Sequence, residues 1–271
     1  PDRCTLRHVP GDSILSALDE SVAVLMLTHV NFRDGRMHDM QQMTRGAKER
    51  GALVLWDLAH SAGAMPVELD ACGADLAVGC GYKYLNGGPG APAFLYVAER
   101  HQNQAGQPLS GWMGHRKPFD FEPSYEPAQG IERYLAGTPG ILGMAALDSA
   151  LEAFEGVSTE DLRRKSVALT QAFIDTVREL NLPDLRLLTP REPEQRGSHV
   201  SLAHPHGYAI AQTLIDRGVI VDFRAPDIIR FGFAPLYNRF MDAGKACQAM
   251  AEIVSEKTYL DPRYSQRSKV T

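Results

Sequence analysis

The predicted fold depends first on two stretches, ESVAVLMLTHVNF from Glu20 to Phe32 and GALVLWD from Gly51 to Asp57. Each holds a short apolar run that ends in a polar residue, and a mixed charged segment separates the two. This order predicts a strand, a helix and a second strand. Two further apolar runs, ADLAVGC and APAFLYVAER, follow along the chain. We therefore expect an α/β fold with a mostly parallel sheet in a large domain.

Three methionines lie between the first two predicted strands. Met37, Met40 and Met43 recur at a spacing of three residues. This spacing is typical of one face of a helix, so we expect the three side chains to form a buried helix face.

The second half of the chain predicts a smaller unit. ILGMAALDSALEAFEG and STEDLRRKSVALTQAFIDTVRELNL are typical of helices, and Ser158 with Asp161 forms a capping pattern at the start of the second. Short apolar runs and the helical GYAIAQTLIDRG follow, before a last helix near Asp242 to Glu256. We divide the chain into residues 1–142, part of a large domain, and residues 143–271, a smaller C-terminal α+β domain with its connecting helix.

A long excursion precedes the second half. Residues 102–140 contain many glycines and prolines, and HRKPFDFEPSYEP is too irregular for a helix or a strand. Long loops in compact domains are usually functional, so we expect this segment to take part in a site.

Composition narrows the class of protein. The 271 residues are 44% hydrophobic and carry a net charge of -5 without a basic block, so we expect neither nucleic acid nor membrane as a partner. The longest apolar run, Val22 to Leu27, is too short to span a bilayer. No metal site is expected, and a reduced cytoplasmic setting is favoured, because the cysteines lack C-x-x-C spacing. They are Cys4, Cys72, Cys80 and Cys247.

The opening PDRCTLRHVPG has neither an initiator methionine nor a signal-peptide pattern. We expect that a segment upstream of it is absent from this sequence.

Polar residues follow three of the predicted strands. Thr28 ends the first, Asp57 ends the second with His60 three residues on, and Tyr82 and Lys83 follow the third. Ligands of open parallel sheets collect at the carboxyl ends of the strands. A lysine and a carboxylate there suit pyridoxal 5'-phosphate (PLP), whose aldehyde forms a Schiff base with lysine and whose ring nitrogen pairs with an acid.

Each of these residues also has an ordinary interpretation. A lysine before a glycine turn is often a surface residue, a strand-end aspartate is often a helix N-cap, and a single histidine is often structural. Lys83 follows Asp57 by 26 positions, which matches one strand-crossover-strand interval and favours a common site. The glycines of NGGPG could cradle a phosphate or only turn the chain under a cofactor, and they lack the order of a P-loop.

Several longer motifs carry a family resemblance. LWDLAHSAG, GCGYKYLNGGPGAPAFLYV, LSGWMGH, GTPGILGMAALDSALE and IIRFGFAPLYN together resemble the kynureninase family, and the likeness spans nearly the whole chain. The resemblance implies a PLP-dependent transferase fold of the aspartate-aminotransferase type, with residues 1–142 binding PLP. It further implies hydrolysis of L-kynurenine, and of its 3-hydroxy form, to anthranilate and L-alanine in the cytoplasm. Such an enzyme is a hydrolase of carbon-carbon bonds in ketonic substances, acting in tryptophan catabolism, the kynurenine pathway and NAD biosynthesis.

The resemblance also assigns catalytic and cofactor-binding roles. Lys83 matches the lysine that forms the Schiff base and shuttles the α-proton. Tyr82 matches a tyrosine that touches the cofactor phosphate and protonates the leaving carbanion. Asp57 matches the partner of the pyridinium nitrogen, His60 its neighbour, and Thr28 a hydroxyl residue near the cofactor.

Three further residues lie outside this cluster in the sequence. Trp112 and Thr138 match residues that reach the cofactor phosphate across the interface of a homodimer with shared active sites, although many relatives have Asn in place of Thr138. Arg230 matches the arginine that grips the α-carboxylate of the amino-acid substrate. Apolar neighbours in IIRFGFA indicate a partly buried cation that needs an anion, and a substrate carboxylate could be that anion.

Alternatives stay open at this point. A related PLP enzyme, either an aminotransferase or a cysteine desulfurase, would share the lysine and the aspartate. The desulfurase needs a mobile nucleophilic cysteine, and none of the four lies in an evident flexible loop. A non-catalytic cofactor-binding fragment is the third interpretation, because relatives supply phosphate-binding and ring-stacking groups from the upstream segment.

Overall fold

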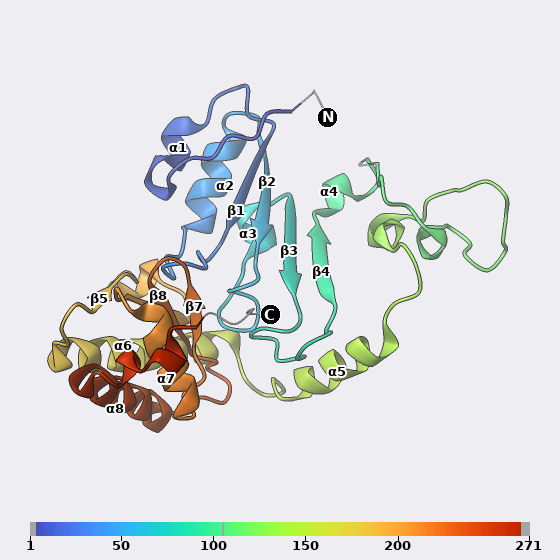
Figure 1. Cartoon of the computed structure of the whole chain (residues 1–271). Coiled ribbons are helices and arrows are strands. Elements are labelled where there is room, and N and C mark those ends of the chain that lie inside the picture. The colour runs from blue at the N-terminus through green and yellow to red at the C-terminus, as the bar shows by residue number, and fades with distance from the viewer. Residues whose placement is uncertain (1–3, 105, 267–271) are drawn as a thin grey trace.

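The computed structural model describes residues 4–104 and 106–266, which form two units, each built on its own sheet (Figure 1). The α-helices are α1 (Ile14–Ala17), α2 (Met40–Lys48), α3 (Leu69–Cys72), α4 (Glu99–Gln102), α5 (Ile141–Glu152), α6 (Thr159–Leu180), α7 (Gly207–Asp216) and α8 (Phe240–Glu256). The strands are β1 (Val24–Thr28), β2 (Leu53–Asp57), β3 (Leu76–Cys80), β4 (Ala93–Val97), β5 (Arg186–Leu187), β6 (His199–Ala203), β7 (Asp222–Arg224) and β8 (Ile228–Gly232). Short 3-10 helices lie at Gly11–Ser13, Trp112–Gly114, Gly130–Tyr134, Pro193–Gln195, Thr258–Leu260 and Pro262–Tyr264.

The N-terminal sheet confirms the expected α/β architecture. Its order is β1-β2-β3-β4, with β1, β2 and β3 parallel and β4 antiparallel to β3. Thr28 lies opposite Asp57 in register, and Asp57 lies opposite Val78. The three parallel strands therefore deliver their carboxyl ends to one edge, as the sequence predicted.

One face of this sheet forms the N-terminal core. Val54, Trp56 and Ala77 alternate with outward residues and are fully buried in a cluster that includes α1 and α2. The indole Nε1 of Trp56 donates to Oγ1 of Thr44 on α2 at 3.1 Å, which ties the helix to the sheet. This satisfied polar contact fixes where α2 crosses β2.

The methionine stripe is only partly a helix face. Asp39 caps α2 by accepting from the backbone N–H of Gln42 at 2.8 Å, so the helix begins at Met40. Met40 and Met43 pack on the N-terminal core, whereas Met37 precedes the helix and packs beside Val30. The prediction was wrong for Met37, because the cap sets the helix start after it.

The opposite face of the N-terminal sheet carries exposed apolar side chains. They are Val24, Met26, Leu53, Val78 and Leu95. All five side chains belong to the alternate positions of their strands, since the buried Val54, Trp56 and Ala77 hold the positions between them. We therefore expect substitutions on the buried face to destabilise the fold more than substitutions on the exposed face.

Two valines on neighbouring strands test that asymmetry. Val54→Ala should lower the free energy of unfolding by about 2 kcal/mol, because it removes fully buried methyl groups and leaves a cavity. Val24→Ala should change it by less than about 0.5 kcal/mol, because Val24 is 49% exposed. Urea unfolding followed by circular dichroism measures both values, and equal losses would contradict the exposure of this face.

The C-terminal sheet is antiparallel, in the order β5-β6-β8-β7. Val200, Leu202 and Phe231 on one face pack into a core with α6, α7 and α8. Ser158 caps α6 by accepting from the N–H of Asp161 at 3.0 Å, which confirms the predicted cap. The expected smaller α+β unit is therefore present.

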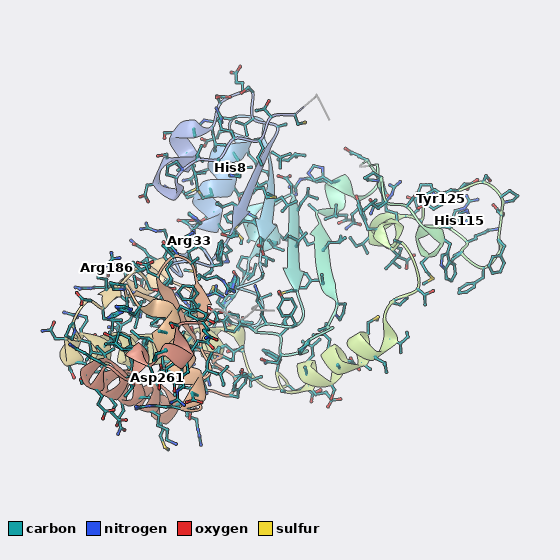
Figure 2. All side chains as sticks on the ribbon, in the orientation of Figure 1. His8, Arg33, His115, Tyr125, Arg186 and Asp261 are labelled. Atoms are coloured by element: carbon teal, nitrogen blue, oxygen red, sulfur yellow. The ribbon has the colours of Figure 1, made fainter. Side chains whose placement is uncertain are left out.

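The two units meet through loops of the first and the segment that precedes β6 in the second. The Tyr84 hydroxyl donates to the carbonyl of Ser198 at 3.1 Å. The backbones of Arg36 and Arg196 form an isolated antiparallel β-bridge. The excursion between α4 and α5 instead projects away from both units (Figure 1). Figure 2 places His115 and Tyr125 on it, and the Tyr125 hydroxyl donates to the carbonyl of Gly114 at 3.1 Å.

Across the described residues, no helix is both long enough and apolar enough to cross a membrane.

Candidate active site

The predicted site residues gather where the parallel strands end. Thr28 and Asp57 are register partners at the ends of β1 and β2. Lys83 lies three residues beyond the end of β3, and its amine is 3.3 Å from Nε2 of His60, which follows β2. Strands that are separate in the sequence thus bring an amine, an imidazole and a carboxylate to one edge of the sheet.

Lys83 is half-buried, and burial lowers the pKa of its amine. The nearby Cys80 and Asp57 act in the opposite direction, yet no ion pair involves Lys83 among the described side chains. A lysine whose amine loses its proton more readily is a better nucleophile toward a carbonyl. The surface interpretation of Lys83 is therefore disfavoured by its burial.

His60 is an uncharged partner for this amine. Burial, with the charge of Lys83 as the next cause, lowers the pKa of His60 to about 3. Its ring lies 5.5 Å from the ring of His199 on β6, measured between centroids. At neutral pH one ring nitrogen donates and the other accepts, so Nε2 can accept a hydrogen bond from the amine of Lys83.

Asp57 combines a structural and an electrostatic role. Its Oδ1 accepts from the N–H of Ala59 at 2.8 Å, as expected of a strand-end cap. Within the described residues, no hydrogen bond engages Oδ2, and the carboxylate charge acts on the pKa values of both Lys83 and Tyr82. Asp57 therefore keeps one oxygen available to a cationic N–H.

Tyr82 lies beside Lys83 and is half-exposed. The lysine amine is 5.7 Å from the centroid of the tyrosine ring. The pKa of Tyr82 is raised, first by Cys80 and then by burial. Its hydroxyl is thus protonated at neutral pH and can donate a proton or a hydrogen bond.

The glycine turn after Lys83 is packed against α5. A Cβ on Gly87 would lie 3.1 Å from the Leu147 side chain, and one on Gly143 would lie 2.3 Å from the carbonyl of Gly90. These glycines allow the helix to approach the turn closely. The sequence predicted a turn here but not this contact with the helix.

Arg230 already has an acidic partner within the chain. Its Nε and Nη2 donate to the two carboxylate oxygens of Asp222 at 2.6 and 2.5 Å, and Nη1 donates to the carbonyl of Phe32 at 2.5 Å. A guanidinium has five N–H groups, so these bonds leave one on Nη1 and one on Nη2. Those two N–H groups could donate to a second carboxylate.

Asp222 was not among the residues predicted from the sequence. Arg230 is 9% exposed, which agrees with the expectation of a buried cation that needs an anion. Asp222 lies directly opposite Arg230 in the β7–β8 register, a pairing that local sequence does not reveal. The local sequence feature that could have indicated this partner is the single acidic residue in VIVDFR.

Trp112 and Thr138 do not join this cluster within one chain. Both are exposed, and Trp112 stacks edge-on against Phe119 at 5.7 Å between centroids. His115, three residues after Trp112, lies on the projecting excursion in Figure 2.

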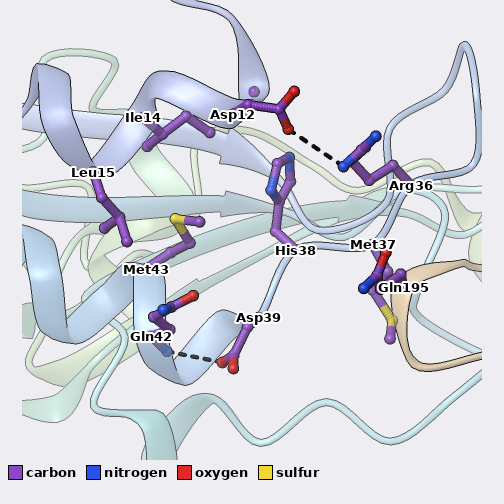
Figure 3. Close-up of a pocket in the computed structure, with 11 residues that line it drawn as sticks. Asp12, Ile14, Leu15, Arg36, Met37, His38, Asp39, Gln42, Met43 and Gln195 are labelled. Carbon is purple, nitrogen blue, oxygen red and sulfur yellow. Dashed lines mark hydrogen bonds and ion pairs between the residues drawn. The ribbon is translucent and has the colours of Figure 1, made fainter. Parts of the chain in front are cut away.

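A pocket of about 320 Å³ lies elsewhere, beside α2 (Figure 3). Asp12 and Arg36, paired at 3.3 Å, line it with His38 and Gln195. It includes none of the predicted site residues. No group of His, Cys, Asp and Glu suited to a metal ion occurs in the described part of the chain.

Comparison with known proteins finds relatives over nearly the whole chain. The family model described as the kynureninase C-terminal domain matches residues 162–250. The kynureninase of Pseudomonas fluorescens is 51% identical over 269 residues, which covers 98% of this chain and 65% of that protein. The chain thus spans somewhat less than two thirds of the length of this relative.

Solved structures share the fold at lower identity. The apo cysteine desulfurase of Thermococcus onnurineus NA1 has a TM-score of 0.75 and 24% identity, covering 88% of this chain and 61% of that one. A lysine-to-alanine mutant of C-DES, with glycine covalently linked to its PLP cofactor, has a TM-score of 0.75 and 21% identity, covering 89% and 63%. The predicted aspartate-aminotransferase-like fold is confirmed.

Proposed function

Because this chain is a homologue of the kynureninases over 98% of its length, we propose that it belongs to an enzyme that hydrolyses L-kynurenine and its 3-hydroxy form to anthranilate and L-alanine. The observation that carries the proposal is the half-buried Lys83 amine beside His60, at the edge where β1 and β2 end in Thr28 and Asp57. The reaction breaks a carbon-carbon bond in a ketonic substrate. The enzyme acts in tryptophan catabolism and NAD biosynthesis, in the cytoplasm.

The residues present fit PLP as the cofactor. Lys83 offers a primary amine with a lowered pKa, and Asp57 offers a carboxylate oxygen without a partner among the described residues. Thr28 and His60 flank them on the same edge. When bound, PLP supplies an electron sink for carbanions formed next to the amino group. The C-DES neighbour carries this cofactor.

Side chains of this chain carry out proton transfer and substrate binding. Lys83 moves a proton at the substrate α-carbon, and neutral His60, whose Nε2 lies 3.3 Å from the amine, accepts a hydrogen bond that orients it. The two free N–H groups of Arg230 bind the α-carboxylate, while Asp222 holds the guanidinium in place. Tyr82, protonated at neutral pH, donates the proton that the departing alanine fragment needs.

An assay on purified protein with PLP tests this function. Incubation with L-kynurenine should release anthranilate and L-alanine in equal amounts, without added pyruvate. Pyruvate-dependent loss of the amino group would indicate an aminotransferase, and sulfur release from L-cysteine would indicate a desulfurase. Either result without anthranilate would overturn the proposal. Cofactor binding without any turnover would leave a binding fragment as the function.

We also propose a homodimer whose excursion completes the active site of the partner with Trp112 and Thr138. The excursion and α5 carry many exposed apolar side chains, and α5 has no buried residue. Exposed apolar patches of this kind mark interaction surfaces. We also propose that residues 1–142 belong to a large domain and that residues 143–271 form a smaller one.

A charge on α5 should separate the dimer. Leu142 is 87% exposed, so Leu142→Glu leaves the fold of a single chain intact but buries a charge if α5 lies in an interface. We expect the variant to sediment as a monomer at concentrations where the unmodified protein is dimeric. Ile220→Glu is the control, because Ile220 is 80% exposed on the other unit. Equal behaviour of the two variants would exclude α5 from the interface.

A further inference from the structure

The C-terminal sheet has one polar face, and that face meets the candidate site. Ser201 lies opposite Arg230 in register, and His199 lies opposite Gly232, so all four share one face. Val200 and Leu202 point to the other face and pack into the core. Since the carbonyl of Phe32 binds Arg230 and the ring of His60 approaches His199, the polar face is turned toward the N-terminal unit.

His199 is buried on this face without a hydrogen-bond partner. It is 4% exposed, and neither Nδ1 nor Nε2 has a partner among the described residues. Burial lowers the pKa of His199 to about 4, with Arg230 as the next cause. The ring is therefore neutral and presents one donor and one acceptor. Buried polar groups of this kind are nearly always satisfied, so a partner is needed.

Space for such a partner lies beside Gly232. Gly232 is exposed, and a Cβ built on it would have no atom within 4 Å. Residues two apart on a strand are separated by about 7 Å, so Gly232 lies that far along β8 from Arg230. A ligand gripped by its carboxylate at Arg230 can extend along the strand past Gly232, opposite His199.

We propose that His199 is a substrate-binding residue, which hydrogen-bonds the aminoaryl-ketone end of the substrate while Arg230 holds the carboxylate end. This inference rests on the proposed function and assigns the half of the substrate that each residue recognises. A neutral imidazole suits that half, because the ketone oxygen accepts a hydrogen bond and the aryl amine donates one.

The two products allow each half to be tested separately. Anthranilate contains the aryl amine, and L-alanine contains the α-amino acid, so titration calorimetry of each product into the PLP-loaded protein reports one half. His199→Phe keeps a buried ring but removes both ring nitrogens. We expect it to weaken anthranilate binding about tenfold and to change L-alanine binding less than about twofold. The KM for L-kynurenine should rise by a similar factor, with a smaller change in kcat.

Two further variants control this experiment. His199→Gln keeps a donor and an acceptor and should recover most of the affinity for anthranilate. His204→Phe removes a buried histidine just beyond the other end of β6, where its ring stacks near Tyr259, and should change neither product's affinity. An unchanged affinity for anthranilate in His199→Phe, or equal losses for both products, would overturn the role of His199. An unmodified protein that binds both products but releases no anthranilate from L-kynurenine would overturn the proposed function instead.

Discussion

Replacing Lys83 with Ala should abolish covalent attachment of PLP and reduce kynurenine turnover by on the order of a thousandfold or more. Lys83 is the half-buried amine at the strand edge, with its pKa lowered by burial and with His60 at 3.3 Å. Removal of the amine takes away both the Schiff-base nucleophile and the base at the α-carbon. Borohydride reduction followed by mass spectrometry measures attachment, and product release measures turnover.

An exposed lysine provides the control for this result. Lys245 lies on the surface of α8, and Lys245→Ala should leave attachment and turnover unchanged. A Lys83→Ala protein that still attaches PLP would show that another lysine is the nucleophile. Retained turnover in the same variant would contradict the assignment of the catalytic base.

Replacing Asp75 with Ala should lower the free energy of unfolding by about 3 kcal/mol. Asp75 is 2% exposed, and its carboxylate accepts from the N–H of Val54 at 2.9 Å, from Arg100 at 2.5 Å and from His101 at 2.8 Å. The substitution leaves the buried Val54 N–H without an acceptor. Because Arg100 is partly exposed, water can hydrogen-bond its guanidinium in the variant. The loss of free energy therefore lies at the lower end of the range for a buried charge pair.

A surface carboxylate gives the matched comparison for Asp75. Asp120 pairs with Lys117 at 3.1 Å, and both side chains are about half-exposed. Asp120→Ala should change the free energy of unfolding by less than about 1 kcal/mol, measured by urea unfolding. Similar losses in the two variants would show that the Asp75 network contributes no more than a surface pair.

The same network should make stability depend on pH. Burial acts to raise the pKa of Asp75, but hydrogen bonds from His101, Val54 and Arg100 outweigh it and hold the pKa below its usual value. A carboxyl with a lower pKa in the folded state stabilises the fold above about pH 4 and loses that contribution as pH falls through the folded value. Asp75→Asn should therefore lose less stability than the unmodified protein between pH 5 and pH 2.

Local sequence predicts most of the elements and the strand edge at which the candidate site residues gather. Apolar runs ending in Thr28 and Asp57 predicted parallel strands, and the Ser158 cap set the start of α6. These features depend on residues close together in the chain, where hydrophobic spacing and capping chemistry act. The motifs around Lys83 and Arg230 added the resemblance, and the comparisons confirmed the fold.

How the strands of the second unit face the first depends on contacts between residues far apart in the chain. The pairing of Asp222 with Arg230, the unpartnered ring of His199 and the uncovered face around Met26 each depend on which strands become neighbours. Strand pairing joins residues far apart in sequence, and a shift of one residue turns every side chain to the other face. Local sequence patterns specify the strands but not their register, so the acid beside Arg230 and the histidine opposite Gly232 emerged only from the fold.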